Sequence, residues 1–299
     1  MPQLFSPRQT IFTNLFALPD NSCMSTPSNT SQTLAFIGGG NMASAIIGGL
    51  LKQGTTANHI LVVEPFEDAR QRLHAQFGVR VLAAADATLA DAGLVVWAVK
   101  PQTFKEAAQQ TGAFCANALH LSVAAGIRSD SIANWLSTDR VVRAMPNTPA
   151  LVGLGQTGLF ARAAVTANDK AWIEQVVATT GDLLWVKDEP LLDAVTALSG
   201  SGPAYVFFFI ESMIEAGVKM GLTPEQATQL AIGTFEGASQ LAKTSSEPPS
   251  VLRERVTSKG GTTYAALTSL QNAHVGELFQ VALKAAQHRA HELGDEFGA

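Results

Sequence analysis

Short apolar runs and helix-spaced apolar positions alternate over the first part of the chain. The run Leu34 to Ile37 is followed at once by a glycine-rich turn. Further runs predict strands at residues 60–63, 79–82, 94–99, 120–124, 140–144, 155–160 and 183–186. Helical spacing predicts helices at residues 45–51, 68–77, 105–110, 129–135 and 168–180. This alternation indicates βαβ units and a parallel sheet.

The pattern becomes helical throughout after about residue 187. Pro203 predicts the start of a long apolar helix that reaches Met220, because a proline at the first position loses no hydrogen bond. Thr223-Pro224-Glu225-Gln226 has the form of a capping box and predicts a second helix that ends near Lys243. Residues 245–250 are expected to form a loop, with further helices at residues 263–270 and 275–293.

Length and composition limit the possible functions. At 299 residues, with 46% hydrophobic and 15% charged residues, the chain is long enough for about two domains with a large core. A net charge of −5 argues against a broad basic surface for nucleic acid. The two cysteines, Cys23 and Cys115, exclude a disulfide framework and a zinc ribbon, and a reducing, cytoplasmic setting is expected. The sequence holds no apolar run long enough for a membrane helix.

The first residues differ in composition from the rest. Residues 1–32 are rich in Ser, Thr, Asn, Pro and Gln, and we expect a disordered extension there. A signal peptide is disfavoured, because Arg8 is the only charged residue before a short, interrupted apolar patch. An alternative hypothesis is that Met24 is the true start of the protein.

The glycine-rich turn carries the pattern G-x-G-x-x-A at Gly38, Gly40 and Ala43. It follows a predicted strand and opens a predicted helix, which is the context of a dinucleotide-binding turn in a Rossmann-type, doubly wound sheet. The residues expected to bind the cofactor here are Ile37, Gly38, Gly39, Gly40, Asn41 and Met42. The alternative is a glycine-rich turn without a ligand.

Glu64 ends the second predicted strand, 21 residues after Ala43. An acid at this place accepts hydrogen bonds from the adenosine ribose, which favours NADH. The 2′-phosphate of NADPH would be repelled by Glu64 and its acidic neighbours, unless Arg70 and Arg72 fold back to compensate. The alternative is that Glu64 is only a solvated strand end.

The ends of two later strands are also expected to face the cofactor, because ligands of doubly wound sheets bind beyond the carboxyl ends of the strands. The fourth strand is followed by Ala98, Val99, Lys100 and Pro101, although Lys100 has the alternative of being an ordinary exposed lysine. The fifth ends in small residues, among them Ala125, which would let a flat nicotinamide lie close to the backbone.

Two Gly/Ser-rich stretches lie in the helical part, at Ser199–Tyr205 and Ser258–Thr263. Both precede helices, and the second is a natural pocket for a carboxylate or phosphate. The histidines near the end of the chain are expected at the surface: His274, His288 and His291. No metal-binding or nucleophile motif is present in the sequence, so the chemistry is expected to come from the cofactor, and hydride transfer fits.

Several motifs resemble those of pyrroline-5-carboxylate reductases. They are Gly39–Ala43, Ala98–Pro101, Arg143–Pro149, Asp193–Tyr205 and Val256–Thr263, in the right order over about residues 33–293. The resemblance implies reduction of 1-pyrroline-5-carboxylate to L-proline with NADPH or NADH, the last step of proline biosynthesis. It also implies a Rossmann domain, here residues 33–187, and an all-helical dimerisation domain, residues 188–299. Such helical domains interlock into a homodimer, and the dimers often assemble into a decamer.

The resemblance also implies roles for the second Gly-rich turn. Gly261 and Thr262 would bind the substrate carboxylate through the backbone, and the Thr263 hydroxyl would face the substrate nitrogen. Ser258 lies in the same turn, and a hydroxyl near that nitrogen can orient the imine and relay a proton. Thr263 and Ser258 are therefore the expected catalytic residues.

This chain departs from the family pattern at three positions. Lys259 stands where many members have Pro, and Glu64 where many have a small hydroxyl residue. Ala85, beside Asp86, stands where many have an Asn that contacts the cofactor ribose. Two other readings stay open: a β-hydroxyacid dehydrogenase, which usually places a catalytic Lys in its helical domain, and a dinucleotide-binding protein that has lost turnover.

Overall fold

The structure is a computed structural model that describes residues 32–298. The predicted disordered extension, residues 1–32, therefore lies outside the described residues apart from Gln32, and so does the question of a start at Met24.

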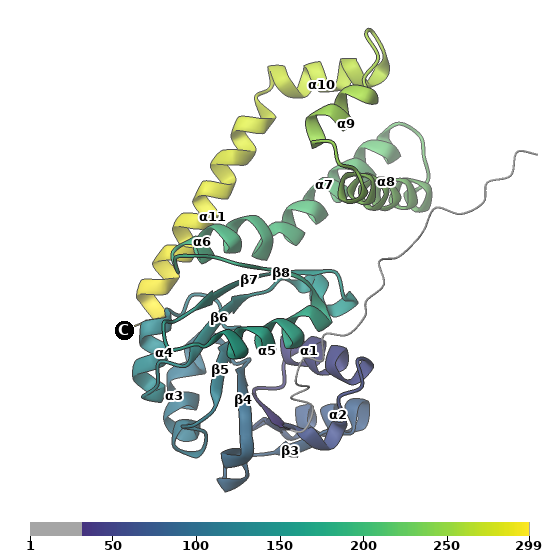
Figure 1. The fold of residues 1–299 in the computed structure, drawn as a ribbon. Helices are drawn as coiled ribbons and strands as arrows, with labels where there is room; N and C mark the ends of the chain where they lie inside the picture. Colours follow the sequence, from purple (N-terminus) through teal and green to yellow (C-terminus); the bar gives the residue numbers. More distant parts are fainter. Residues whose placement is uncertain (1–31, 299) are drawn as a thin grey trace, which may run out of the picture. The chain divides into compact units, whose positions relative to one another are not determined.

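An open sheet occupies the first part of the described chain (Figure 1). Its strand order is β3-β2-β1-β4-β5-β6-β7-β8. The strands are β1 (Thr33–Ile37), β2 (Ile60–Val63), β3 (Arg80–Leu82), β4 (Ala92–Trp97), β5 (Leu119–Ser122), β6 (Val141–Met145), β7 (Gly155–Ala161) and β8 (Gly181–Trp185). Strands β1 to β6 pair in parallel, and the chain order reverses between β1 and β4. This is the predicted doubly wound arrangement, and its ligand-binding crevice is expected where the order reverses.

Helices cover both faces of the sheet. The α-helices are α1 (Asn41–Lys52), α2 (Glu67–Phe77), α3 (Pro101–Thr111), α4 (Ser129–Leu136) and α5 (Ala167–Val177). Short 3₁₀ helices are η1 (Ala57–His59), η2 (Ala87–Asp91), η3 (Gly112–Phe114), η4 (Thr148–Val152) and η5 (Ala178–Thr180). On one face of the sheet, Phe36 packs in a core with Ile47 of α1 and Ile173 of α5. On the other face, Trp97 packs with Phe104 of α3. Burial on both faces explains the continuous apolar runs in the sequence.

One strand does not follow the predicted parallel pattern. β7 pairs antiparallel with β6 and parallel with β8. The chain returns from β6 to β7 through the short helix η4, which is too short for the crossover that a parallel pair needs. The sheet is therefore mixed at this edge.

The second part of the chain is helical, as predicted. It contains α6 (Leu191–Val195), the π-helix η6 (Thr196–Gly200), α7 (Gly202–Lys219), α8 (Pro224–Thr244), α9 (Pro249–Arg255), α10 (Thr262–Asn272) and α11 (Val275–Phe297). The capping box at Thr223 and Gln226 is formed as predicted. The loop expected at residues 245–250 is wrong in its last part, because Pro249 opens the short helix α9.

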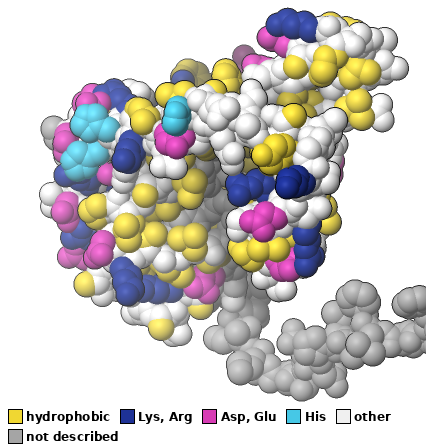
Figure 2. Space-filling view, turned by 90° about the horizontal axis from the view of Figure 1, so that it is seen from above, with side chains coloured by type: hydrophobic (Ala, Val, Ile, Leu, Met, Phe, Trp, Pro, Cys, Tyr) yellow, Lys and Arg dark blue, Asp and Glu magenta, His cyan; other side chains and the backbone are white. Residues whose placement is uncertain are grey.

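The helical part has little core of its own. The residues of α7 and α8 that are buried within the described chain are Gly217, Ala227 and Ala231, and none of α9 or α10 is buried. Large apolar side chains such as Phe207, Phe208 and Leu230 lie exposed instead. Seen from above, Figure 2 shows many hydrophobic side chains open at the surface. Within residues 32–298, no helix is both long and apolar enough to cross a membrane.

A buried polar contact joins Trp97, the last residue of β4, to His120, the second residue of β5. Trp97 Nε1 donates to His120 Nδ1 at 3.1 Å, so the proton of the neutral imidazole sits on Nε2. That Nε2 is buried and has no hydrogen-bond partner among the described residues. Burial, followed by the charge of Arg140, lowers the pKa of His120 to about 4.

We predict that His120 makes the protein acid-sensitive. The pKa of His120 in the folded chain lies below its ordinary value of 6.5, so the unfolded chain binds a proton there at a higher pH than the folded chain does. The free energy of unfolding is therefore higher above pH 6.5, and it decreases as pH falls towards 4. One group shifted this far contributes on the order of 3 kcal/mol. Urea unfolding between pH 7 and pH 4 should show a smaller loss for His120→Gln, whose amide oxygen can still accept from Trp97. Parallel curves for the two proteins would contradict the prediction.

Candidate active site

The glycine turn after β1 has the geometry that its sequence predicts. Gly38 has a φ of +93°, and a Cβ there would stand 2.7 Å from the Ala98 carbonyl oxygen. A Cβ at Gly40 would meet nothing within 4 Å, which leaves open space above the turn. Ala43 is fully buried where α1 meets the sheet. Each residue of the G-x-G-x-x-A pattern thus serves a separate need: a tight turn, an open approach and close packing.

The first turn of α1 is free to receive an anion. Gly40 is its N-cap and provides no side-chain acceptor, and no acidic residue lies in the first turn. The N–H groups of Asn41, Met42 and Ala43 therefore have no intrahelical partner. Together with the open space at Gly40, they fit the pyrophosphate of a dinucleotide.

Glu64 is not a solvated strand end. Its side chain is buried, and its carboxylate accepts hydrogen bonds from Gly39 N at 2.9 Å and from Phe66 N at 3.0 Å. A Cβ at Gly39 would stand 2.4 Å from Leu73 Cδ1 and 3.3 Å from Glu64 Oε2, so only glycine leaves room for this contact. The middle residue of the glycine turn therefore ties the turn to the end of β2. The sequence pattern left that position unspecified.

Arg70 does fold back towards Glu64, but its donors are used locally. Its guanidinium donates to the carbonyl oxygens of Glu64, at 2.9 Å, and Pro65, at 2.7 Å. It also pairs with the Glu67 carboxylate. The Arg70 cation thus pairs with Glu67, and among the described residues its donors go to carbonyl oxygens and to Glu67, not to the Glu64 carboxylate.

Backbone hydrogen bonds hold the remaining predicted cofactor residues at the same edge of the sheet. Gly38 N donates to Val63 O at 2.9 Å, and Ala98 N donates to Ile37 O at 2.8 Å. On the far side of β4, Val123 N donates to Trp97 O at 3.0 Å. The structure thereby gathers Ile37, Gly38, Gly39, Gly40, Asn41, Met42, Glu64, Ala98, Val99, Lys100, Pro101 and Ala125 beyond the carboxyl ends of β1, β2, β4 and β5.

The second Gly-rich turn, residues 258–263, lies between α9 and α10. Gly260 has a φ of +72°, and Gly261 N donates to Ser258 O at 3.0 Å. Gly261 is the N-cap of α10 and offers no side chain, so the first N–H groups of this helix are also unsatisfied from within. Thr262 and Thr263 stand in that first turn, which suits a small carboxylate.

The two groups of predicted site residues do not meet within one chain. Figure 1 shows α10 far from α1 and from β4, at the opposite end of the described chain. The hydrogen bonds at the 258–263 turn are local, and the Thr257 hydroxyl before it donates to Arg253 O.

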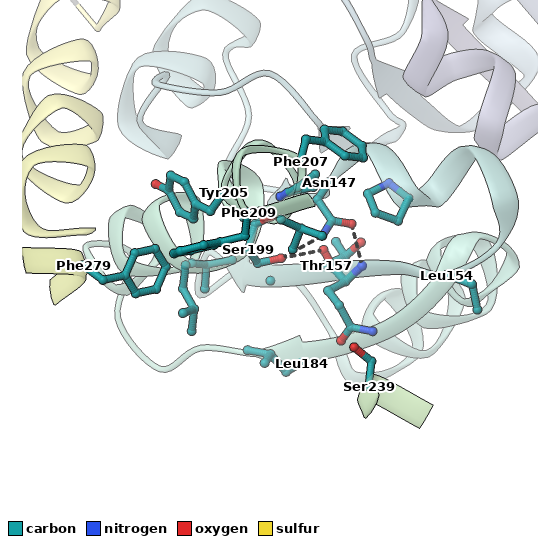
Figure 3. A pocket seen from close by; sticks show the side chains of 18 residues that line it. Asn147, Leu154, Thr157, Leu184, Ser199, Tyr205, Phe207, Phe209, Ser239 and Phe279 are labelled. Atoms are coloured by element: carbon teal, nitrogen blue, oxygen red, sulfur yellow. Dashed lines mark hydrogen bonds between the residues drawn. The ribbon is translucent and has the colours of Figure 1, made fainter. Parts of the chain in front are cut away.

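A cavity of about 860 Å³ lies between β7, β8 and the start of α7 (Figure 3). At its base, Asn147 Nδ2 donates to Ser199 O and Oγ, both at 3.2 Å, while Gln156 N donates to Asn147 Oδ1 at 2.8 Å. None of the predicted cofactor or substrate residues lines it. Its rim is apolar and exposed at Leu198 and Phe207. Asn147 was not named as a site residue from the sequence, although it lies in the Arg143–Pro149 motif that resembles the family.

The other sequence expectations about polar groups concern metals and histidines. Within residues 32–298, no group of three or more His, Cys, Asp or Glu is placed to hold a metal ion. His274, His288 and His291 are exposed, as predicted.

Comparison with known proteins agrees with this architecture. A family model described as pyrroline-5-carboxylate reductase dimerisation matches residues 189–293, and one described as NADP oxidoreductase coenzyme F420-dependent matches residues 33–126. The pyrroline-5-carboxylate reductase of Pseudomonas aeruginosa is 43% identical over 277 residues, which cover 92% of this chain and 100% of that protein. This chain belongs to the pyrroline-5-carboxylate reductase family.

Solved structures place the fold in the same family. A pyrroline-5-carboxylate reductase from Coxiella burnetii is 38% identical, covers 88% of this chain and 98% of its own, and superposes with a TM-score of 0.83. The pyrroline carboxylate reductase of Plasmodium falciparum, solved with NADP bound, is 28% identical, covers 89% and 99%, and has a TM-score of 0.79. The predicted fold class, family and nicotinamide-type cofactor are confirmed at this level, whereas the domain boundaries and individual site residues stay predictions.

We predict that alanine at Gly38 lowers stability, whereas alanine at Gly40 lowers the affinity for a dinucleotide and leaves stability unchanged. Gly38→Ala forces an alanine into a positive φ against Ala98 O and should cost on the order of 1–2 kcal/mol of stability. Gly40→Ala meets no protein atom, so the free energy of unfolding should be unchanged. Its affinity for a dinucleotide should still fall about 10-fold, because the new methyl fills the approach to the pyrophosphate.

Calorimetric titration with NADH and urea unfolding of both variants would check this pair. Wild-type affinity in Gly40→Ala would show that the dinucleotide does not approach this turn.

Proposed function

We propose that this member of the pyrroline-5-carboxylate reductase family reduces 1-pyrroline-5-carboxylate to L-proline. A bound nicotinamide cofactor supplies the hydride, which adds to the carbon of the C=N bond, while a proton goes to the nitrogen. The observation that carries the proposal is the presence, in one chain, of two helix N-termini without side-chain caps. One opens on the glycine turn of the sheet, and the other carries Gly261, Thr262 and Thr263.

The turn at α10 suits a cyclic imino acid. Its unsatisfied N–H groups and the positive end of the helix dipole fit the substrate carboxylate. The Thr263 hydroxyl, in the same first turn, would face the imine nitrogen, and Ser258 would assist by orienting the imine or passing a proton. A protonated imine is already electrophilic, so the reaction needs no strong general acid. The absence of a metal or nucleophile motif in the sequence agrees with such chemistry.

We also propose that two copies of the chain complete each site. The turn at α10 lies far from the glycine turn of its own chain, and the helices that carry it expose apolar faces. The side chains of Phe207, Phe208 and Leu278 are more than half exposed. Two interlocked helical domains would bury such apolar surface. The match to a dimerisation family model supports self-association. A decamer of such dimers stays an expectation from the family.

The described cysteine supports a reducing, cytoplasmic setting for the proposed activity. Cys115 is a free, buried thiol, and burial raises its pKa to about 11. A thiol held in this form is neither a nucleophile nor ready to form a disulfide.

Loss of the Thr263 hydroxyl should slow the enzyme without unfolding it. With pyrroline-5-carboxylate and NADH or NADPH, followed at 340 nm, Thr263→Ala should lower kcat/KM roughly 10–100-fold, or about 1.4–2.8 kcal/mol. Thr268→Ala is the matched control, because it removes a hydroxyl from the same helix that only bonds to Tyr264 O. Wild-type kinetics for Thr263→Ala would refute its role, and a folded wild type with no turnover would refute the reaction.

Subunit mixing tests the shared site in the same assay. Gly40→Ala and Thr263→Ala subunits carry lesions in different halves of the site. If each site takes one half from each chain, a mixed dimer keeps one intact site, and random mixing should restore about a quarter of wild-type activity. No recovery on mixing would mean that each chain builds its own site.

Cofactor choice follows from the charge at the end of β2. The buried Glu64 carboxylate stands where the adenosine ribose is expected, and both of its bonded donors are backbone N–H groups. Glu67 and Asp68 add negative charge in the first turn of α2, while the Arg70 donors are taken by carbonyl oxygens and Glu67. This set suits a neutral ribose diol better than a phosphate dianion. Ala85, at the third departure from the family pattern, packs against the core and has no side-chain amide that could contact the cofactor ribose.

We predict that the wild type has the lower KM for NADH and that Glu64→Ser narrows the difference. The ratio of the two KM values should move at least about 10-fold towards NADPH, since removing the charge removes about 1.4 kcal/mol or more of repulsion. Glu64→Asp keeps the charge and should keep the preference, even if both KM values rise. A wild type that prefers NADPH would overturn the charge argument.

A further inference from the structure

The turn between β5 and α4, residues 123–128, lies at the edge of the sheet where the nicotinamide end of the cofactor is expected. Gly126 has a φ of +70° in this turn. A Cβ there would stand 2.9 Å from Leu293 Cβ and 3.5 Å from a ring carbon of Phe297, both on α11. The backbone of the turn is thus pressed directly against the last turns of the C-terminal helix.

Polar contacts fasten the same end of α11 to α4. Arg128 pairs with Asp295, and Ser131 Oγ donates to Gly298 O at 2.7 Å. Gly294 allows the approach, because a Cβ there would stand 3.1 Å from Arg128 Nε. Phe297 also packs against the core on that face of the sheet, and Figure 1 shows the end of α11 beside α4.

The start of α4 is held from another direction by Glu189. Its carboxylate accepts from Ser129 N at 2.6 Å and from Ser129 Oγ at 2.5 Å, and it also pairs with Arg143. These bonds use donors at the N-terminus of α4, so that helix end is committed to the protein itself. The turn is therefore held between Glu189 and α11, at the edge of the sheet where the ligand crevice is expected.

We infer that the carboxyl-terminal end of α11, through Leu293 and Phe297, is a positioning element for the nicotinamide end of the cofactor. These residues act through the Ala124–Gly126 backbone and do not touch the cofactor themselves. The inference rests on the proposed use of a nicotinamide cofactor. Loosening the packing of Leu293 and Phe297 would let the 123–128 turn shift, and the backbone that contacts the nicotinamide ring would move. The pyrophosphate and adenosine parts of the cofactor, which the turns after β1 and β2 bind, would be unaffected.

Two ligands separate this positioning role from a general structural one. NADH carries the nicotinamide ring, whereas ADP-ribose has the same adenosine and pyrophosphate without it. Phe297→Ala should weaken NADH binding about 5–10-fold, measured by calorimetry, and leave the ADP-ribose affinity unchanged. Phe297→Leu, which refills most of the space, should restore NADH binding. Glu296→Ala is the matched control, since Glu296 bonds to Arg289 on the outer face of α11.

Asp295→Asn serves as a milder second variant, because it breaks the ion pair with Arg128 at an exposed position. It should shift NADH affinity about twofold, again with no change for ADP-ribose. Equal losses for both ligands, or no loss for either, would overturn the inference. These binding constants need no turnover, so a wild type that fails to reduce pyrroline-5-carboxylate would refute the proposed function and leave this test intact.

Discussion

The parallel pairing of β1 with both β2 and β4 is the constraint on which the rest of the structure depends. It buries both faces of the central strands, which therefore need helices on either side. It also brings three carboxyl ends to one edge of the sheet. Gly38 can then lie against Ala98 only without a side chain, and the Glu64 carboxylate reaches the Gly39 amide. The chemistry of the cofactor site follows from the topology, not from a dedicated loop.

The helical part obeys a different rule. Its helices bury few of their own residues, although α7 is apolar on most faces. A single chain leaves this surface in water, at a cost that grows with the exposed area. The turn at residues 258–263, which suits a small carboxylate, lies between α9 and α10. It is far from the glycine turn after β1 of the same chain. Self-association, which the match to a dimerisation family model supports, would cover this apolar surface.

The sequence predicted those features that rest on periodicity or on local chemistry. Continuous apolar runs mark the buried strands, and the glycine turn and the Thr223 capping box are formed as expected. Long-range contacts were not readable: the Glu64–Gly39 bond and the packing of Leu293 on Gly126 each join residues distant in sequence. The start of α9 was missed because residues 245–250 resemble a loop, and no particular helix was predicted at Thr196–Gly200, which forms a π-helix.

α11 contacts both the sheet and the helical part of the described chain. Its 23 residues make a rod about 34 Å long. One end is locked to the β5–α4 turn, and the other begins at His274, whose φ of +52° sets a sharp corner after α10. The C-terminal helix therefore carries the α10 turn at a defined distance from the cofactor edge of its own chain.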